Sequence, residues 1–433
     1  MTAEAGREVL DRLVTAGFTA AEVYVKRGRS RRFEVDGSSE STLEAEEAGW
    51  AVRAARGAGS FFFACSGTPV PLERWPEPLE GAPLTLPAAA AIDGWSEPPE
   101  VAEPLLGEDE GRRLLRRLTA DVERRLPRAA LHQAVLEDGA AEVSISNHLG
   151  VAVGHRGRFA ALRLEARAAL AAGAAPATLV LAERSVRGFP LDALADRLID
   201  LLAVRSGGEI GSTPGAEMVL APEVGARLLA PIGAAFVDRT PGEVAALLAQ
   251  RAGRVAAAEV SLIDDGRHPR GAVAAPVDGE GVPTGKRILI EDGRVADTIL
   301  PWQRGGAAVG CRARAGWRDL PRVAASHLFV APREDVSPAS LIEDLPHGFY
   351  LLDAGAGGSY DLAAERFSLP VWGFRIAAGR PLHPIGEARL VGDPRRWLEG
   401  VCGVARDLRF APLGPMIGAP SLRVRGLTLQ QNG

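Results

Sequence analysis

The 433-residue sequence contains little cysteine and no long apolar stretch. Its three cysteines, Cys65, Cys311 and Cys402, lie far apart, which excludes a disulfide framework and a paired-cysteine zinc site. The longest uncharged apolar run lies between Arg167 and Glu183, and it is shorter than the ~20 residues of a membrane-spanning helix. The amino-terminal segment carries several charges, unlike a signal peptide. We therefore expect a soluble, cytoplasmic protein.

Positive charge is not in excess either. The sequence has 50 lysine and arginine residues against 55 aspartate and glutamate residues, so its net charge is −5. Proteins that bind nucleic acids or membrane surfaces concentrate positive charge instead. In the arginine-rich segment 108–125, acidic residues largely offset the arginines. We therefore expect neither nucleic acid nor a membrane among the partners of this protein.

Glycine and proline are abundant, with 50 and 31 residues, which favours turns and short strands. Apolar periodicity and capping residues predict helices over 3–16, 108–125, 191–204 and 222–236, and a further helix that begins at Asp393-Pro394. The strongest hairpin signal is Asp292-Gly293. Strands are expected over 21–26, 32–35, 49–54, 61–64, 131–136, 141–146, 151–155, 160–168, 218–220, 287–290, 295–300, 327–330, 349–353, 367–376, 387–391 and 422–429.

This order of elements predicts an α+β fold with two domains. Residues 1–205 form an amino-terminal domain with two units, each a helix followed by four antiparallel strands. Their similarity suggests an internal duplication, and the proline-rich segment 69–107 connects them as extended chain. Residues 206–433 form a β-rich, antiparallel carboxy-terminal domain.

No complete catalytic motif is present. None of the seven histidines is followed by glutamate, so the HExxH zinc motif is absent, and no serine or cysteine nucleophile motif occurs. The densest polar cluster contains Asp264, Asp265 and His268, followed by Asp278 and Glu280. Carboxylates and histidine at this density could bind a metal or transfer protons. Turns closed by aspartate and glycine account for the same pattern without a ligand, and we favour this structural interpretation.

Several segments together resemble the TldD/PmbA family, metallopeptidase-related proteins once called modulators of DNA gyrase. The similarity extends over nearly the whole chain. Its most specific part is 261–284, SLIDDGRHPRGAVAAPVDGEGVPT, which is similar to the Asp-Asp-Pro turn and the Asp-x-Glu-Gly-x-x-Thr run of the family. Weaker similarities lie at 21–23, 49–54, 143–150 (VSISNHLG) and 418–422.

The resemblance also implies where a metal site would lie. TldD-type chains carry an HExxxH helix and a cysteine near the carboxy terminus as zinc ligands, whereas TldE/PmbA-type chains lack them. In this sequence the histidine positions are Ala230 and Ala235, the glutamate position is Pro231, and the cysteine window 413–417 contains no thiol. Alanine side chains cannot bind zinc, so the resemblance implies a metal-free chain without catalytic residues.

The resemblance therefore implies a non-catalytic, PmbA/TldE-like subunit of a heterodimeric peptidase that acts on unfolded or small peptides. Its partner would be a TldD-like catalytic subunit that holds the zinc, and a homodimer could form without that partner. We expect strand edges and Asp264, Asp265, His268, Asp278 and Glu280 to contact peptide substrate. Two alternatives remain: a self-sufficient metallopeptidase with a non-standard metal site, and a regulator associated with DNA or gyrase.

Overall fold

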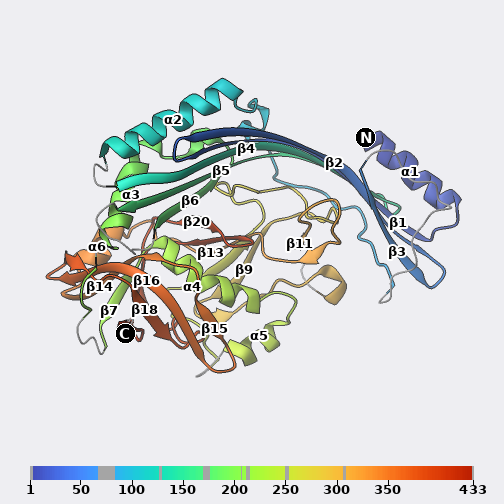
Figure 1. Cartoon of the computed structure of the whole chain (residues 1–433). Coiled ribbons are helices and arrows are strands. Elements are labelled where there is room, and N and C mark those ends of the chain that lie inside the picture. Colours follow the sequence, from blue (N-terminus) through green and yellow to red (C-terminus); the bar gives the residue numbers. More distant parts are fainter. Residues whose placement is uncertain are drawn as a thin grey trace.

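The computed structural model describes residues 3–66, 83–125, 129–168, 176–205, 207–210, 215–248, 253–305 and 309–431. One long antiparallel sheet forms the amino-terminal region, and a nine-stranded and a six-stranded sheet form most of the carboxy-terminal region (Figure 1). The fold class is α+β, as the sequence predicts. None of the helices in these residues is long and apolar enough to cross a membrane.

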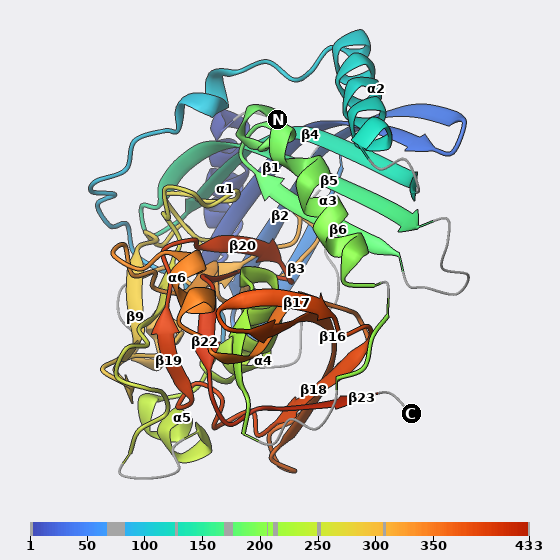
Figure 2. The ribbon, with the colours of Figure 1, turned by 90° about the vertical axis from the view of Figure 1, so that its left-hand side faces the viewer.

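Six antiparallel strands form the amino-terminal sheet in the order β3-β2-β1-β4-β5-β6. Strands β1, β2, β4 and β5 have 17 to 19 residues each and arch over the carboxy-terminal region in Figure 1. Helices α1, α2 and α3 cover the outer face, and Figure 2 shows α2 and α3 lying across the strands. The bounds are α1 Ala3–Thr15, β1 Ala20–Asp36, β2 Ser39–Arg56, β3 Gly59–Cys65, α2 Glu108–Arg125, β4 Ala129–Asn147, β5 Ala152–Ala168, β6 Ala177–Glu183 and α3 Leu191–Ala203.

Both faces of this sheet are covered. Along β1, Val23, Val25 and Phe33 point to the helices, because alternate side chains of a strand share a face. Tyr24 points to the opposite, inner face and packs with Trp317 from the carboxy-terminal region. The inner face is therefore a contact surface between the two regions.

The number of strands differs from the prediction. Each unit has a helix, two long strands and one strand of seven residues, rather than four short strands. The sequence predicts a turn at the basic segment 27–31, between the expected strands 21–26 and 32–35. In the structure this segment lies in the middle of β1, where Glu44 of β2 pairs with Arg29 and Arg31. Pairing on both sides thus outweighs the local turn signal. The symmetrical strand order fits a duplication, but the domain division remains a prediction.

Two sheets form most of the carboxy-terminal region. A nine-stranded sheet has the order β19-β22-β7-β14-β16-β18-β23, with β15 and β17 also paired to β16, and a six-stranded sheet has the order β10-β9-β8-β13-β21-β20. The pairs β7/β14 and β13/β21 are parallel, and the other pairs are antiparallel. The bounds are β7 Glu217–Leu220, β8 Leu262–Asp265, β9 Lys286–Glu291, β10 Arg294–Val295, β11 Arg312–Ala313, β12 Arg322–Val323, β13 His327–Val330, β14 His347–Ala354, β15 Ser359–Asp361, β16 Arg366–Ala377, β17 Arg380–Pro384, β18 Ala388–Gly392, β19 Val401–Val404, β20 Arg409–Pro412, β21 Met416–Ala419, β22 Leu422–Val424 and β23 Thr428–Gln431.

Helix α4 (Pro222–Ala235) packs between these two sheets and has the predicted position. The helix approaches strands β21 and β13 so closely that glycine is needed at two of its positions. A Cβ atom on Gly225 would lie 2.9 Å from the Ala419 side chain of β21, and one on Gly233 would lie 2.0 Å from the Leu328 side chain of β13. The largest hydrophobic core of the described residues surrounds this helix.

Other carboxy-terminal predictions were partly wrong. The residues after Asp393 form turns rather than a helix, although Trp397, Leu398 and Val401 are buried as expected. The segment 422–429 is divided between β22 and β23, and β10 is shorter than expected. Two short helices, α5 (Pro241–Leu248) and α6 (Pro338–Glu343), were not predicted. In the proline-rich connector, residues 83–107 contain only one regular element, the 3-10 helix η2 (Pro99–Ala102), and 69–82 lie outside the described residues.

Candidate functional site

Helix α4 carries the positions at which the family resemblance places zinc ligands. The helix contacts β20 and β21, and the window 413–417, in which a cysteine would be expected, covers the turn between these strands and the first two residues of β21. The tertiary structure therefore brings the two parts of the motif together. Of the three helix positions, Ala230 and Pro231 are half-buried and Ala235 is buried.

These residues do not fit a metal. Zinc in proteins takes nitrogen, sulfur or carboxylate oxygen ligands from side chains, whereas the side chains of Ala230, Pro231 and Ala235 contain only carbon as heavy atoms. Pro231 also lacks a backbone N–H, so it cannot donate the helical bond to the carbonyl of Arg227. Among the residues that the structure describes, no group of three histidine, cysteine, aspartate or glutamate side chains is arranged to bind a metal.

Asp264 and His268, two residues predicted to contact substrate, lie near the end of β8 in different environments. The Asp264 carboxylate is buried, accepts hydrogen bonds from the backbone N–H (2.8 Å) and hydroxyl (3.1 Å) of Ser326, and has its pKa raised to about 6 by burial. The His268 ring is half-buried between Phe329 and Phe410, with ring centroids 4.9 and 5.0 Å away. Burial lowers the pKa of His268.

Asp265 and His327 complete this cluster. The Asp265 carboxylate accepts a hydrogen bond from the backbone N–H of Arg267, and its carbonyl oxygen lies 3.1 Å from Nδ1 of His327. His327 is fully buried, and its Nε2 atom has no hydrogen-bond partner in the described residues. Burial, with a smaller contribution from neighbouring His268, lowers the pKa of His327 to about 4, so the His327 ring is neutral at pH 7. Asp265 and His268 are the less buried members of the cluster.

Asp278 holds a loop together. Its carboxylate accepts four backbone hydrogen bonds of 2.9 to 3.0 Å, which join the turn at 278–282 to the start of β11. Burial raises the pKa of Asp278 to about 6. Glycine is required beside it, because a Cβ atom on Gly310 would lie 2.8 Å from the Asp278 side chain. The four bonds occupy both carboxylate oxygens.

Glu280 belongs to a buried ionic cluster that connects the two regions. Arg53 of β2 donates a 2.7 Å hydrogen bond to Glu280 and two more to Glu22 of β1, and both glutamates are almost completely buried. Arg314 also binds Glu22, while Arg312 lies 3.4 Å from Glu280. Within the described residues, the Glu280 carboxylate thus faces guanidinium groups inside the molecule.

A groove of about 530 Å³ lies beside the His268 cluster. Strand β6 and helix α3 form one side, and Arg270 with Phe410 of β20 forms the other. The ring of His268 packs behind Phe410, so this predicted residue supports the groove wall. A second hollow, of about 360 Å³, shares Glu183, Gly188 and Arg270 with the groove and extends towards η2.

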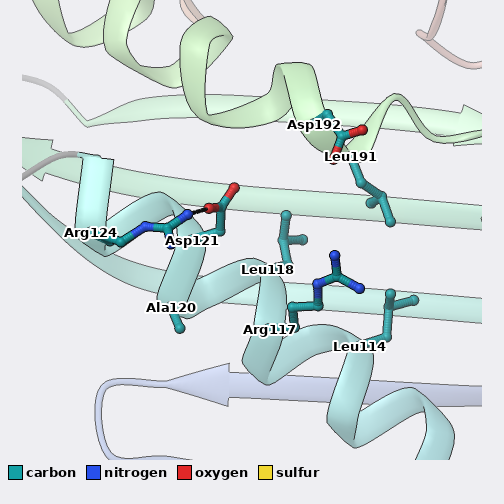
Figure 3. A pocket seen from close by; sticks show the side chains of 8 residues that line it. All are labelled: Leu114, Arg117, Leu118, Ala120, Asp121, Arg124, Leu191 and Asp192. Carbon is teal, nitrogen blue, oxygen red and sulfur yellow. Dashed lines mark hydrogen bonds and ion pairs between the residues drawn. The ribbon is translucent and has the colours of Figure 1, made fainter.

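Another hollow, of about 590 Å³, lies on the outer side of the molecule between α2 and α3 (Figure 3). Leu114, Leu118 and Leu191 contribute apolar side chains, and Arg117 points into the space between them. None of the residues predicted to contact substrate line this hollow or the groove, but His268 packs against Phe410 in the wall of the groove. We therefore place the candidate site at the groove near His268.

Comparison with known proteins identifies the family. Residues 213–431 match the model of the PmbA/TldA metallopeptidase C-terminal domain, and this match covers just over half of the chain. The chain therefore belongs to this metallopeptidase-related family. It is 24% identical over 196 residues to a metalloprotease TldD homolog of Buchnera aphidicola from Acyrthosiphon pisum, and 23% identical over 194 residues to its counterpart from Schizaphis graminum. These matches cover 41% of this chain and 39% of each relative, so the chain spans about two fifths of the relatives that it matches.

Solved structures share the fold over nearly the whole chain. TldE from Thermococcus kodakarensis has a TM-score of 0.82 at 17% identity, with 99% of this chain and 100% of that chain covered. A protein of Thermotoga maritima described as a modulator of a DNA gyrase has a TM-score of 0.77 at 16% identity, with 98% and 99% covered. At these identities the similarity establishes the fold alone.

Sequence reasoning missed the groove itself. Arg184 donates hydrogen bonds to the carbonyl oxygens of His268 (3.0 Å) and Gly271 (2.9 Å), and so fixes the loop that forms one wall. Phe410 lies about 140 residues from His268 in the sequence, and no local motif connects them. The available signal was the short apolar run 179–182 of β6, which is consistent with a strand but does not show that the strand lies at the edge of a sheet.

Proposed function

We propose that this chain is the metal-free, non-catalytic subunit of a heterodimeric peptidase and that it assembles with a TldD-like catalytic subunit. The observation that supports this is the composition of α4. The helix lies where the family resemblance expects a zinc site, between two sheets and against the β20–β21 turn, yet Ala230, Pro231 and Ala235 carry no donor atoms.

Peptide hydrolysis needs an activated water or a nucleophilic side chain. A methyl-lined helix supplies neither, and the Asp264–His268 cluster is engaged in internal contacts. The role assigned to this chain is therefore to stabilise the catalytic subunit and to help hold unfolded or small peptides near the partner's zinc.

The test combines the two purified subunits. The isolated chain should leave an unfolded peptide intact, whereas the mixture with the TldD-like subunit should form a stable complex that cleaves it. Substitution of the glutamate in the partner's HExxxH motif should abolish cleavage. Asp264→Ala or His268→Ala in this chain should at most weaken peptide binding.

The opposite result would contradict the proposal. If the isolated chain cleaves peptide and His268→Ala abolishes that cleavage, the chain has an active site of its own. If no complex forms with the TldD-like subunit, the assignment as its partner fails even if the chain is inactive alone.

A further inference from the structure

The outer hollow between α2 and α3 is formed by one side of each helix (Figure 3). The first turn of α3 contributes Leu191 and Asp192. The residues that α2 contributes follow one another at helical spacing, and they are Leu114, Arg117, Leu118, Ala120, Asp121 and Arg124. Beside the hollow, Arg125 of α2 pairs with Asp196 of α3 and donates a 3.3 Å hydrogen bond to the carbonyl oxygen of Asp192. These contacts fix the two helices to each other.

The hollow has the size and the lining of a site for a small ligand. Its volume of about 590 Å³ lies within the range of roughly 300–1,000 Å³ that such sites have. Leu118 is buried, whereas Leu114 and Leu191 are half-buried, so the three leucines form an apolar surface that is partly open to solvent. An apolar group of a ligand would displace water from this surface, which favours binding.

One cation in the lining has no partner within the part of the chain that the structure describes. Arg124 is paired with Asp121 of the same helix. Asp192 lies in the first turn of α3, where the backbone N–H groups of a helix stabilise a negative charge. Arg117 makes neither a hydrogen bond nor an ion pair with any described residue, and it points into the space between the leucines (Figure 3). The hollow therefore offers an unpaired guanidinium group beside an apolar surface.

This combination suits a carboxylate that is attached to an apolar group. A guanidinium group binds a carboxylate through two parallel N–H···O hydrogen bonds, and the opposite charges strengthen both. A phosphate group carries nearly two negative charges, so Asp121 and Asp192 in the same lining would repel it more strongly than a carboxylate. The carboxyl terminus of a peptide has its carboxylate next to the last side chain, and an apolar last side chain matches the leucine surface.

We propose that the hollow between α2 and α3 binds the carboxyl terminus of a peptide whose last residue is apolar. Arg117 binds the terminal carboxylate, the three leucines contact the last side chain, and the rest of the peptide extends into solvent. The site lies on the outer face of the amino-terminal sheet, whereas α4 packs between the two carboxy-terminal sheets. The inference therefore goes beyond the proposed function and does not depend on it.

The test measures the binding of a short peptide that ends in leucine to the full-length chain, by the fluorescence anisotropy of a label at the amino terminus of the peptide. Amidation of the carboxyl terminus removes the charge and should weaken binding about tenfold. Replacement of the last leucine by serine should also weaken binding about tenfold, because the apolar contact is lost.

Decanoate tests a second source of the same chemistry, since a fatty acid also joins a carboxylate to an apolar group. The unlabelled peptide should displace the labelled peptide at lower concentrations than decanoate does. If decanoate is the more effective competitor, the hollow is a fatty-acid site and the assignment to a peptide is overturned.

Arg117→Gln should reduce the difference between the free acid and the amide to about twofold or less, because glutamine keeps hydrogen-bonding groups but not the charge. Arg113→Gln is the matched control, since Arg113 is an exposed arginine of the same helix that does not line the hollow. The control should leave the difference at about tenfold. Arg117 is exposed as well, so both variants should fold.

Four results would overturn the inference. They are equal binding of the free acid and the amide, an unchanged difference in Arg117→Gln, an equal loss of the difference in Arg113→Gln, and no peptide binding at concentrations up to about 1 mM. The third result would show that the general charge of α2, and not Arg117 in the hollow, attracts the peptide.

Discussion

Gly49 of β2 lacks a side chain because the indole ring of Trp317 occupies the space where one would lie. A Cβ atom at this position would be 2.1 Å from the ring, a distance that ordinary packing does not allow. Trp317 is buried against the inner face of the amino-terminal sheet. A single glycine therefore permits the carboxy-terminal region to approach this sheet.

Gly49→Ala should lower the free energy of unfolding by about 2 to 3 kcal/mol, because the added methyl group forces the buried indole to move. Gly157→Ala in β5 is the control: its Cβ would meet no atom within 4 Å and its φ angle is not positive. The control should change stability by at most about 0.5 kcal/mol. Urea unfolding of both variants checks this, and equal effects would show that the Trp317 contact is not tight.

His327 makes stability depend on pH. Its pKa is lowered by burial to about 4, below the ~6.5 of an unfolded chain. The folded state therefore resists protonation, and the stability that the neutral ring contributes is fully present above pH 6.5 and is lost as the pH falls towards 4. His268 and Arg184 lie close enough to add positive charge against protonation.

His327→Asn removes this titration while retaining a side-chain donor for the Asp265 carbonyl. The stability advantage of the wild type over the variant should shrink by about 2 kcal/mol between pH 7 and pH 5. Chemical unfolding at several pH values measures the difference. A constant difference across this range would mean that His327 is protonated as readily in the folded protein as in the unfolded chain.

At the scale of elements, α4 lies where the family resemblance places a zinc-binding helix, but it has the composition of a core helix. Its glycines allow two sheets to pack against it, and nine of its fourteen residues are buried. The face that remains partly open carries Arg227, Ala230 and Pro231. The chemical character of this site therefore depends on a few side chains and not on the packing of the helix.

We expect the purified chain, after zinc loading and desalting, to retain well below one equivalent of zinc. The reason is that three or four donor atoms are needed and α4 offers none at the motif positions. Elemental analysis measures the metal, with the TldD-like subunit as the positive control. About one tightly held zinc per chain would contradict the metal-free proposal and direct attention to Asp264, Asp265 and His268.

At the scale of the whole molecule, the cluster of Glu22, Arg53, Glu280, Arg312 and Arg314 connects the amino-terminal sheet to the carboxy-terminal loops. Three guanidinium groups share two carboxylates in a buried place. Removal of one carboxylate charge increases the excess of positive charge in a place that water does not solvate. Removal of the most exposed arginine reduces this excess.

Glu280→Gln should therefore lower the free energy of unfolding by about 3 to 5 kcal/mol, as expected when one partner of a buried ion pair is removed. Arg312→Gln is the comparison, because the Arg312 side chain is 22% exposed and lies 3.4 Å from Glu280. Its effect should stay below about 1 kcal/mol. If urea unfolding gives equal decreases in the free energy of unfolding for the two variants, the excess of positive charge is not the reason why Glu280→Gln destabilises the protein.

The sequence by itself determined the class of fold and most of the elements. Helices α2 and α4 are where apolar periodicity and capping place them, and the Asp292-Gly293 turn joins β9 and β10 as predicted, with both residues at positive φ. These features depend on local backbone preferences, and the residues within a few positions along the chain are enough to predict them. The absence of donor atoms at Ala230, Pro231 and Ala235 was also evident from the residues alone.

Only the tertiary structure decided how long the amino-terminal strands are and where the predicted site residues point. The segment 27–31 is part of a strand because β2 and β4 pair with it on both sides, and Glu44 of β2 balances the charges of Arg29 and Arg31. Asp278 and Glu280 became internal partners of backbone amides and of Arg53, and His268 came to support Phe410 at the groove. Each outcome depends on residues tens to hundreds of positions away, and the burial that shifts the pKa values exists only after the chain has folded.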